Sequence, residues 1–159
     1  MDNCETLIDK FLPVLAAILG AAVGFVLNFW AGLQREKEQN RRLFSVQMSA
    51  LLDEVMANKS LLNNMALKAP RLRQEGWFSV LNSGVLRWTT GDAVHRLRDF
   101  YQGVLAYNEQ VAIFLDDQRS PGNEIGLRDL RANLAPLTDE VIELLKGQIR
   151  KFDQFSYFL

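Results

Sequence analysis

The chain has 159 residues, of which 48% are hydrophobic, and its 18 Lys and Arg residues nearly balance 19 Asp and Glu residues, for a formal net charge of −1. Nucleic-acid-binding domains normally carry a marked basic excess, so this balance gives no strong nucleic-acid signal. The one cysteine excludes an internal disulfide framework and a zinc site built from cysteines. The length suits one domain with a modest core of its own.

Residues 11–33 form an unbroken run of 23 positions without a charged side chain. As a helix this run would be about 35 Å long, enough to cross a hydrocarbon core of about 30 Å. The preceding residues 1–10 are acidic, whereas a secretory signal peptide has a basic start and a shorter apolar core before a small-residue cleavage site. We therefore predict a retained transmembrane helix.

The charges that flank the run predict its orientation. Residues 1–10 carry three acidic side chains and one lysine, and basic side chains follow the run at Arg35, Lys37, Arg41 and Arg42. Because basic flanks stay cytoplasmic, we expect residues 1–10 outside and residues 34–159 inside; in a bacterial protein this would be the inner (plasma) membrane. Trp30 fits an aromatic anchor at the cytoplasmic interface.

Small and polar residues recur every fourth position within the run, which places them on one helix face. Gly20 and Gly24 form a GxxxG element that allows close backbone approach, and Asn28 would seek a partner amide on another copy. The competing interpretation is that glycines are common in membrane helices and that Asn28 reaches the headgroups. We predict that membrane lipid surrounds this helix and that it self-associates, or lines a pore, through Ala16, Gly20, Gly24, Asn28 and Gly32.

A long cytoplasmic helix is predicted next, because no glycine or proline lies between residues 35 and 69; Pro70 should end it. Its apolar residues alternate in spacing between three and four, and Asn58 occupies one step of this seam. A polar seam residue can set register and oligomeric state, although it can also pair within one monomer. The seam comprises Phe44, Met48, Leu51, Val55, Asn58, Leu62 and Met65.

Three further helical segments are predicted. A short helix should cover 74–81, followed by a turn at 82–84. A helix starting at Thr89 or Thr90 carries a second seam, again with one asparagine, Asn108. The last quarter is predicted to be a helix interrupted at Pro136, where the proline should either start a new helix or kink an existing one. The fold class is thus all-α, with a transmembrane helix that continues into a cytoplasmic helical bundle; the second seam comprises Val94, Leu97, Tyr101, Val104, Asn108, Val111 and Leu115.

The chain carries no catalytic signature. His95 is the single histidine, the cytoplasmic segment has no cysteine, and neither an HExxH motif nor a phosphate-binding loop is present. We predict no enzymatic activity, no metal site and no cofactor.

Arginines and a tryptophan gather near predicted turns and helix starts. Guanidinium forks and aromatic stacking could bind an anionic ligand, such as a small nucleotide signal, or a cytosolic effector protein. The competing interpretation is a solvated surface on which arginines pair with carboxylates. The candidate patch comprises Arg71, Arg73, Arg87, Trp88, Arg96 and Arg98.

The layout resembles a diffuse group of small bacterial single-span membrane proteins with a helical cytoplasmic domain. The resemblance is carried by the pattern W-x-x-x-L-N-S-G-x-L from Trp77 to Leu86 and by the aromatic helix that follows. Some members are accessory or effector proteins of CRISPR and other antiphage systems, including a pore-forming type. Nuclease-like members carry an Arg–His pair; here Arg87 is too far from His95 to match it, so no catalytic residue is carried over.

Two functions therefore stand as expectations. The resemblance implies a self-assembling inner-membrane effector. One way in which such an effector could act is by forming an oligomeric pore that permeabilises the membrane. The alternative is a membrane-tethered helical interaction module that recruits a cytosolic partner without pore activity. The predicted organisation is the same for both: a short extracytoplasmic N-terminus (1–10), a transmembrane helix (11–33) and a cytoplasmic domain (34–159).

Overall fold

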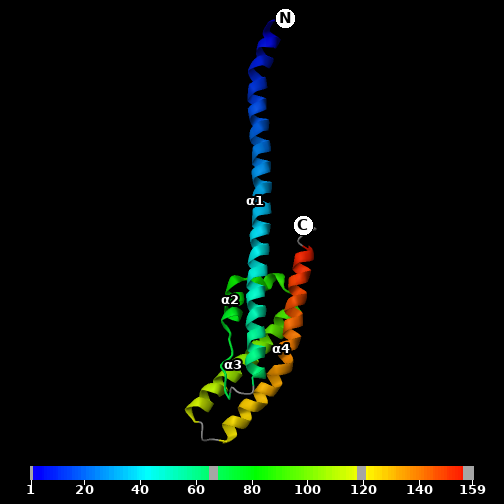
Figure 1. The fold of residues 1–159 in the computed structure, drawn as a ribbon. Coiled ribbons are helices and arrows are strands. Elements are labelled where there is room, and N and C mark those ends of the chain that lie inside the picture. Colours follow the sequence, from blue (N-terminus) through cyan, green and yellow to red (C-terminus); the bar gives the residue numbers. More distant parts are fainter. Residues whose placement is uncertain (1, 65–67, 118–120, 156–159) are drawn as a thin grey trace. The chain divides into compact units, whose positions relative to one another are not determined.

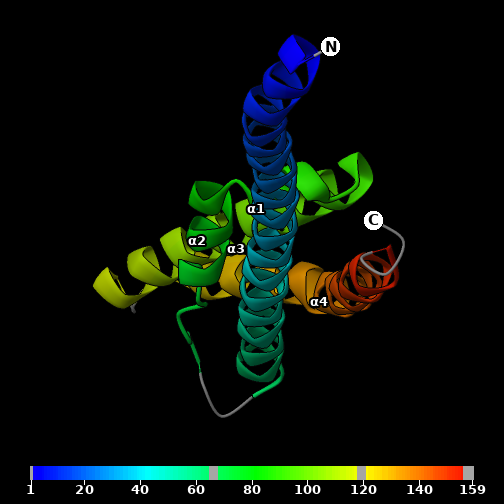
Figure 2. The same cartoon turned by 90° about the horizontal axis from the view of Figure 1, so that it is seen from above.

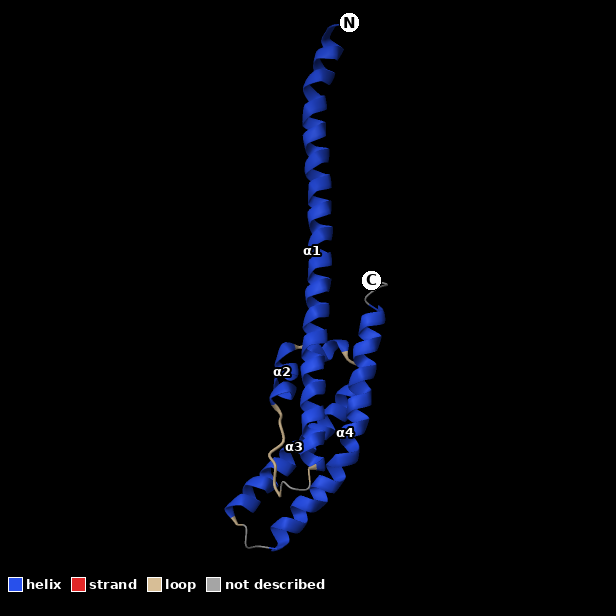
Figure 3. Cartoon of the chain, viewed as in Figure 1, coloured by secondary structure: helices blue, strands red, loops and turns tan. Residues whose placement is uncertain are grey.

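The computed structural model describes residues 2–64, 68–117 and 121–155, and within these ranges every regular element is helical (Figures 1 and 3). The predicted all-α fold is confirmed, with a long apolar N-terminal helix followed by packed helices. The elements are α1 (Asp2–Asn63), α2 (Glu75–Ser83), the short 3-10 helix η1 (Val85–Trp88), α3 (Gly91–Asp116) and α4 (Pro121–Phe155).

The chain divides into two compact units, residues 1–40 and residues 41–159. The first, called here the N-terminal unit, consists of the first part of α1. The second, called here the bundle, contains the rest of α1 together with α2, η1, α3 and α4. The predicted boundary near residue 33 concerns the membrane and stays a prediction.

The seam predicted in α1 forms one wall of the bundle core. Spacings of three and four residues keep these side chains on one helix face, and each is at most 2% exposed. In Figure 2, seen from above, α2 and α4 lie on different sides of α1. Met65 lies outside the described residues. The buried seam comprises Phe44, Met48, Leu51, Val55, Asn58 and Leu62.

The seam predicted in α3 is buried in its middle but differs at its end. Leu97, Val104 and Val111 are buried, whereas Leu115 is 56% exposed and Phe114 is buried at 8%. Successive residues of an α-helix point about 100° apart, so burying Phe114 turns Leu115 outward. The assignment of Leu115 to the core is therefore wrong.

Helix α1 ends at Asn63, before Pro70, so the predicted end is wrong. The guanidinium of Arg131, from α4, donates hydrogen bonds to the carbonyl oxygens of Leu62 (2.5 Å) and Asn64 (2.8 Å). The last carbonyl groups of a helix lack partners within it, and a basic side chain can satisfy them. A residue 69 positions away from Leu62 thus contributes to ending α1.

Pro136 lies inside α4, so the predicted start of a new helix at this proline is wrong. The proline ring removes one intrahelical donor, and this position is on the solvent side of the helix, where water can serve the freed carbonyl. Two residues later, the buried Thr138 hydroxyl donates to the carbonyl of Ala135 at 2.6 Å. The helix therefore continues through the proline.

Candidate membrane anchor and polar sites of the bundle

The N-terminal unit carries a helical segment long and apolar enough to cross a membrane. The segment begins at Phe11, has a mean hydropathy of 2.2 and is not buried. Its large apolar side chains from Phe11 to Trp30 are between 54% and 73% exposed. Such an extended apolar surface marks an interaction with lipid or protein. The segment is consistent with a membrane anchor and with a signal sequence.

The five residues predicted to form a self-association face are all exposed along α1. A Cβ atom placed on Gly20, Gly24 or Gly32 would meet no atom within 4 Å. Nothing within the described chain therefore requires glycine at these positions. The amide of Asn28 also makes no hydrogen bond to any described part of the chain. Together with Ala16, these residues leave a face on which another helix could approach closely.

The two seam asparagines hold one short extended segment by its backbone. Asn58, fully buried, donates to the carbonyl of Arg73 at 2.8 Å and accepts from its N–H at 2.7 Å. Asn108 does the same for Leu72, at 2.9 Å and 2.8 Å. Each amide thus replaces the paired hydrogen bonds that a neighbouring strand would supply.

This arrangement gives both asparagines a role within one chain. A buried amide needs partners for its donor and its acceptor, and here each amide finds both on the segment between α1 and α2. Of the two interpretations of the polar seam residues, pairing within the monomer is the one that these bonds match. Neither asparagine is left to specify contact with another copy.

A buried carboxylate fixes the start of α2. Glu54, in α1, is 7% exposed and accepts hydrogen bonds from the N–H groups of Gly76 (2.6 Å) and Trp77 (3.3 Å) and from the Tyr101 hydroxyl (2.6 Å). The first N–H groups of a helix need acceptors from elsewhere, and a negative charge is favourable there. Glu54 therefore attaches α2 to α1.

The same site brings two aromatic rings together. The Trp77 and Tyr101 rings are parallel, with centroids 5.0 Å apart and 3° between their planes. Burial, and then the hydrogen bond to Glu54, raises the pKa of Tyr101 far above its usual value. The hydroxyl therefore keeps its proton and donates it to the carboxylate over the whole physiological range.

The Glu54 carboxylate leaves little space for a side chain at residue 76. A Cβ atom at Gly76 would lie 3.1 Å from the nearer carboxylate oxygen of Glu54. Contacts this short force the neighbour to move, so glycine permits the short hydrogen bond between the Gly76 N–H and Glu54. Because all three hydrogen bonds of Glu54 go to other residues of the bundle, we regard it as a structural site.

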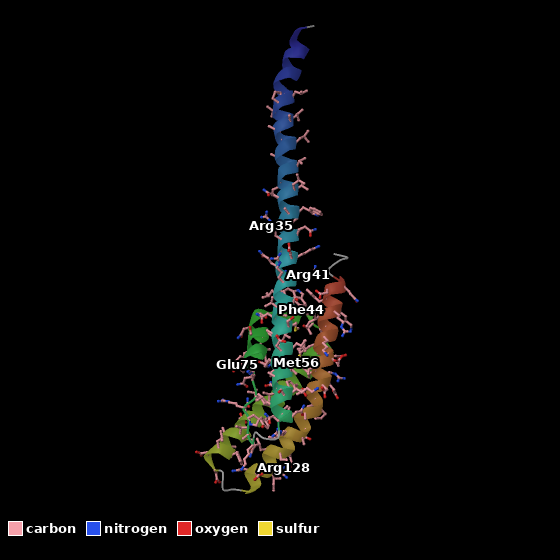
Figure 4. All side chains as sticks on the ribbon, in the orientation of Figure 1. Arg35, Arg41, Phe44, Met56, Glu75 and Arg128 are labelled. Atoms are coloured by element: carbon pink, nitrogen blue, oxygen red, sulfur yellow. The ribbon has the colours of Figure 1, made fainter. Side chains whose placement is uncertain are left out.

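The candidate arginine patch is not brought together. Arg73 pairs with Asn58 through its backbone, whereas the Arg87 guanidinium carbon lies 4.2 Å from the ring of Trp88, which packs against Phe44. Phe44 and Asn58 are 14 positions apart in one helix, or about 21 Å. These arginines therefore lie at different levels of the bundle. In Figure 4, Arg41 and Phe44 mark one end of the bundle and Arg128 the other.

Of the remaining members of the patch, Arg96 and Arg71 lie near carboxylates. Arg96 forms an ion pair with Glu140 at 3.2 Å. The pKa of Glu75 is lowered by backbone hydrogen bonds at the start of α2 and, to a smaller extent, by the charges of Arg73 and Arg71. Arg98 is exposed on α3. The surroundings of this group match the solvated-surface interpretation.

His95 is exposed on α3. Among the described residues, no group of three or more His, Cys, Asp and Glu side chains is arranged to hold a metal ion. The absence of an enzymatic activity stays a prediction.

Sequence reasoning missed the two residues that tie the bundle together, Glu54 and Arg131. Glu54 follows Asp53, and because successive residues of a helix point about 100° apart, Asp53 is exposed whereas Glu54 is buried. The only signal for Glu54 is its place three positions after the seam residue Leu51. Arg131 gives no signal, because its acceptors belong to a distant helix end.

Comparison with protein-family models, curated proteins and solved structures gave no match to this chain. The resemblance to single-span antiphage effectors is therefore a matter of layout and stays a prediction.

Proposed function

We propose that this protein is a membrane-tethered helical module: residues 11–33 anchor the chain, and the bundle is displayed at the membrane surface for a cytosolic partner. One observation carries the proposal. The apolar helix is wholly exposed, while the bundle attached to it satisfies its own seam asparagines and covers its own core. An anchor and a self-contained domain are the two parts that a tether requires.

Self-association belongs to the anchor in this proposal. The exposed face with Gly20, Gly24 and Asn28 has no contact partner among residues 2–64, 68–117 and 121–155. In hydrocarbon, close backbone packing and a hydrogen bond between amides favour helix pairs, the latter by about 0.6 kcal/mol on average. The homo-oligomer is therefore held together by contacts between the transmembrane helices, and the bundle does not contribute to it.

A pore-forming effector is the second candidate, and Asn28 is the observation that favours it. This exposed amide lies on the same face as the small residues, within an otherwise apolar segment. In a ring of several copies, that face could line a lumen. An antiphage role, in which assembly permeabilises the inner membrane, would follow from such a ring.

The mass of the full-length protein in detergent, measured by light scattering with detergent correction, separates the two candidates. A tethered module gives a monomer or dimer, which has too few helices to enclose water. A discrete ring of about six or more copies, together with dye leakage from liposomes, supports the pore and contradicts the tether.

Matched variants test the association face. Gly24→Ile places a branched side chain on the face and should shift the species to a smaller mass. Ala22→Ile adds similar bulk about 160° away around the helix and should leave the mass unchanged. Equal masses for wild type and Gly24→Ile would remove this face from the assembly.

Anchoring and orientation have their own test, because Cys4 is the only cysteine. A membrane-impermeant maleimide should label Cys4 in intact cells if residues 1–10 lie outside. Intact mass of the membrane fraction shows whether residues 1–33 are retained. Loss of these residues would identify a cleaved signal sequence and exclude the anchor.

A further inference from the structure

One end of the bundle gathers basic side chains from three elements that are far apart in the sequence. Arg41 and Arg42 lie in α1, Arg87 lies in η1, and Arg150 and Lys151 lie near the end of α4. These five residues are called here the basic end. We propose that the basic end docks on the anionic headgroups of the membrane, so that the bundle lies against the bilayer. The proposal rests on the membrane anchoring proposed above.

Three aromatic rings hold these elements together. The centroid of the Phe44 ring lies 3.9 Å from that of Phe152 and 6.4 Å from that of Trp88. The Trp88 and Phe152 centroids are 6.3 Å apart. These contacts join the start of the bundle's part of α1 to η1 and to the last turns of α4.

The basic side chains surround this aromatic cluster. Arg150 and Lys151 immediately precede Phe152, and both are exposed. Arg87 is exposed and lies with its guanidinium carbon 4.2 Å from the centre of the Trp88 ring. Arg41, three residues before Phe44, forms an ion pair with Asp153 of α4 at 3.7 Å. The three elements thus present their charges at one end.

The basic end carries an excess of positive charge although the whole chain has a net charge of −1. Carboxylates also lie near it: Asp153, which pairs with Arg41; Glu38, one helical turn before Arg42 in α1; and Asp92, two residues after Thr90, the acceptor of a 3.0 Å hydrogen bond from Gln148. The five basic side chains outnumber these acidic ones. Basic residues close to an anionic leaflet each strengthen attachment about fivefold.

Chain connectivity places a membrane within reach. Arg41 follows the end of the apolar run, Leu33, by eight residues, which span at most about 28 Å when fully extended. The half-buried Trp88 adds a side chain that favours the headgroup region. The short connection to the anchor and the positive charge both point to a lipid surface as the binding partner of the basic end. They also identify the end of the bundle that carries Phe44 as the one that docks.

Hydrogen–deuterium exchange of the full-length protein in lipid nanodiscs tests this docking. Discs of phosphatidylcholine are compared with discs that also contain phosphatidylglycerol. We expect slower exchange over 85–88 and 148–154 in the anionic discs, and no change over 122–128 at the other end. Raising the ionic strength from about 0.1 M to about 1 M shortens the Debye length to about 3 Å and should abolish the difference.

Matched charge variants make the test specific. The triple variant Arg87→Gln, Arg150→Gln, Lys151→Gln should weaken docking on the order of a hundredfold and remove the difference between discs. The control variant Arg71→Gln, Arg73→Gln, Arg128→Gln removes the same charge from exposed positions elsewhere on the bundle and should retain it.

The outcomes distinguish this inference from the proposed anchor. A protein that does not enter nanodiscs contradicts the anchor itself. A protein that enters both kinds of disc but exchanges equally in them overturns the docking and leaves the anchor intact. Protection that persists at high salt, or in the triple variant, also overturns it, because the contact is then not made by these charges.

Discussion

At the scale of single residues, Glu54 shows how one buried charge can organise a small bundle. Its carboxylate, from α1, receives two N–H groups of α2 and the hydroxyl of Tyr101 on α3. Hydrogen bonds to a charged group are stronger than neutral ones, and donors left buried without an acceptor cost free energy. Three helices therefore depend on one side chain.

Glu54→Ala should lower the free energy of unfolding by about 3–5 kcal/mol, because it orphans three buried donors at once. Glu54→Gln keeps an acceptor oxygen and should cost less. The neighbouring exposed residue gives the control, since Asp53→Ala should change stability by about 0.5 kcal/mol or less. Urea unfolding followed by circular dichroism measures all three, and equal effects at both positions would contradict this role.

The raised pKa of Tyr101 makes stability depend on alkaline pH. The folded state holds the phenolic proton more tightly than the unfolded state, whose tyrosine titrates near pH 10. Its contribution is complete below pH 10 and is lost as pH rises above it, at up to about 1.4 kcal/mol per pH unit.

Tyr101→Phe should therefore flatten the fall in unfolding free energy between about pH 10 and 11.5 by up to this slope, after correction for its lower stability at pH 7. Burial also raises the pKa of Tyr107, so part of the alkaline loss should remain in the variant. Parallel pH profiles for the two proteins would show that Tyr101 ionises as freely in the fold as outside it.

At the scale of elements, α3 and α4 pack closely at Gly103. A Cβ atom there would lie 2.7 Å from Cδ2 of Leu134, which is buried at 2% exposure. Because the packed surroundings restrict the movement of Leu134, a methyl group at residue 103 would push the helices apart.

We expect Gly103→Ala to be about 1–3 kcal/mol less stable than Gly147→Ala, although both replace a helical glycine. A Cβ atom at Gly147 meets nothing within 4 Å, so that variant should gain up to about 1 kcal/mol from helix propensity alone. Thermal unfolding measures the difference. If both variants were stabilised equally, there would be space for a Cβ atom at residue 103, which would contradict the close contact with Leu134.

At the scale of the whole molecule, the two compact units differ in what they need from their surroundings. The N-terminal unit exposes almost every apolar side chain between Phe11 and Leu33, whereas the bundle contains a continuous core made of its own residues. A self-contained core predicts independent folding of residues 41–159.

The fragment 41–159 should be soluble, helical and monomeric, and should unfold in one cooperative transition. The physical reason is that the hydrogen-bond partners described above for its buried asparagines and for Glu54 all lie inside it. Light scattering and thermal circular dichroism provide the measurement. An aggregated or unfolded fragment would show that the bundle requires the anchor or the bilayer.

Much of the fold was predictable because its signals are local. The uncharged run of residues 11–33 indicates a membrane-compatible helix by length alone, and the three–four spacing from Phe44 to Leu62 assigns the buried face of α1 before any partner is known. The short helix after Pro70 was also expected, but it runs to Ser83, so the predicted turn at 82–84 is wrong for its first two residues; Gly84, where φ is +70°, closes the helix.

Tertiary structure decided what sequence patterns could not, because those features join residues far apart in the chain. Periodicity marks Asn58 and Asn108 as buried but cannot tell a partner copy from the backbone of residues 72 and 73. It cannot reveal that Arg131 ends α1, or that Arg87 and Arg150 share an end with Arg41. Local hydrophobicity determined which segments are helices and which faces are apolar; only packing decided which polar and charged groups meet.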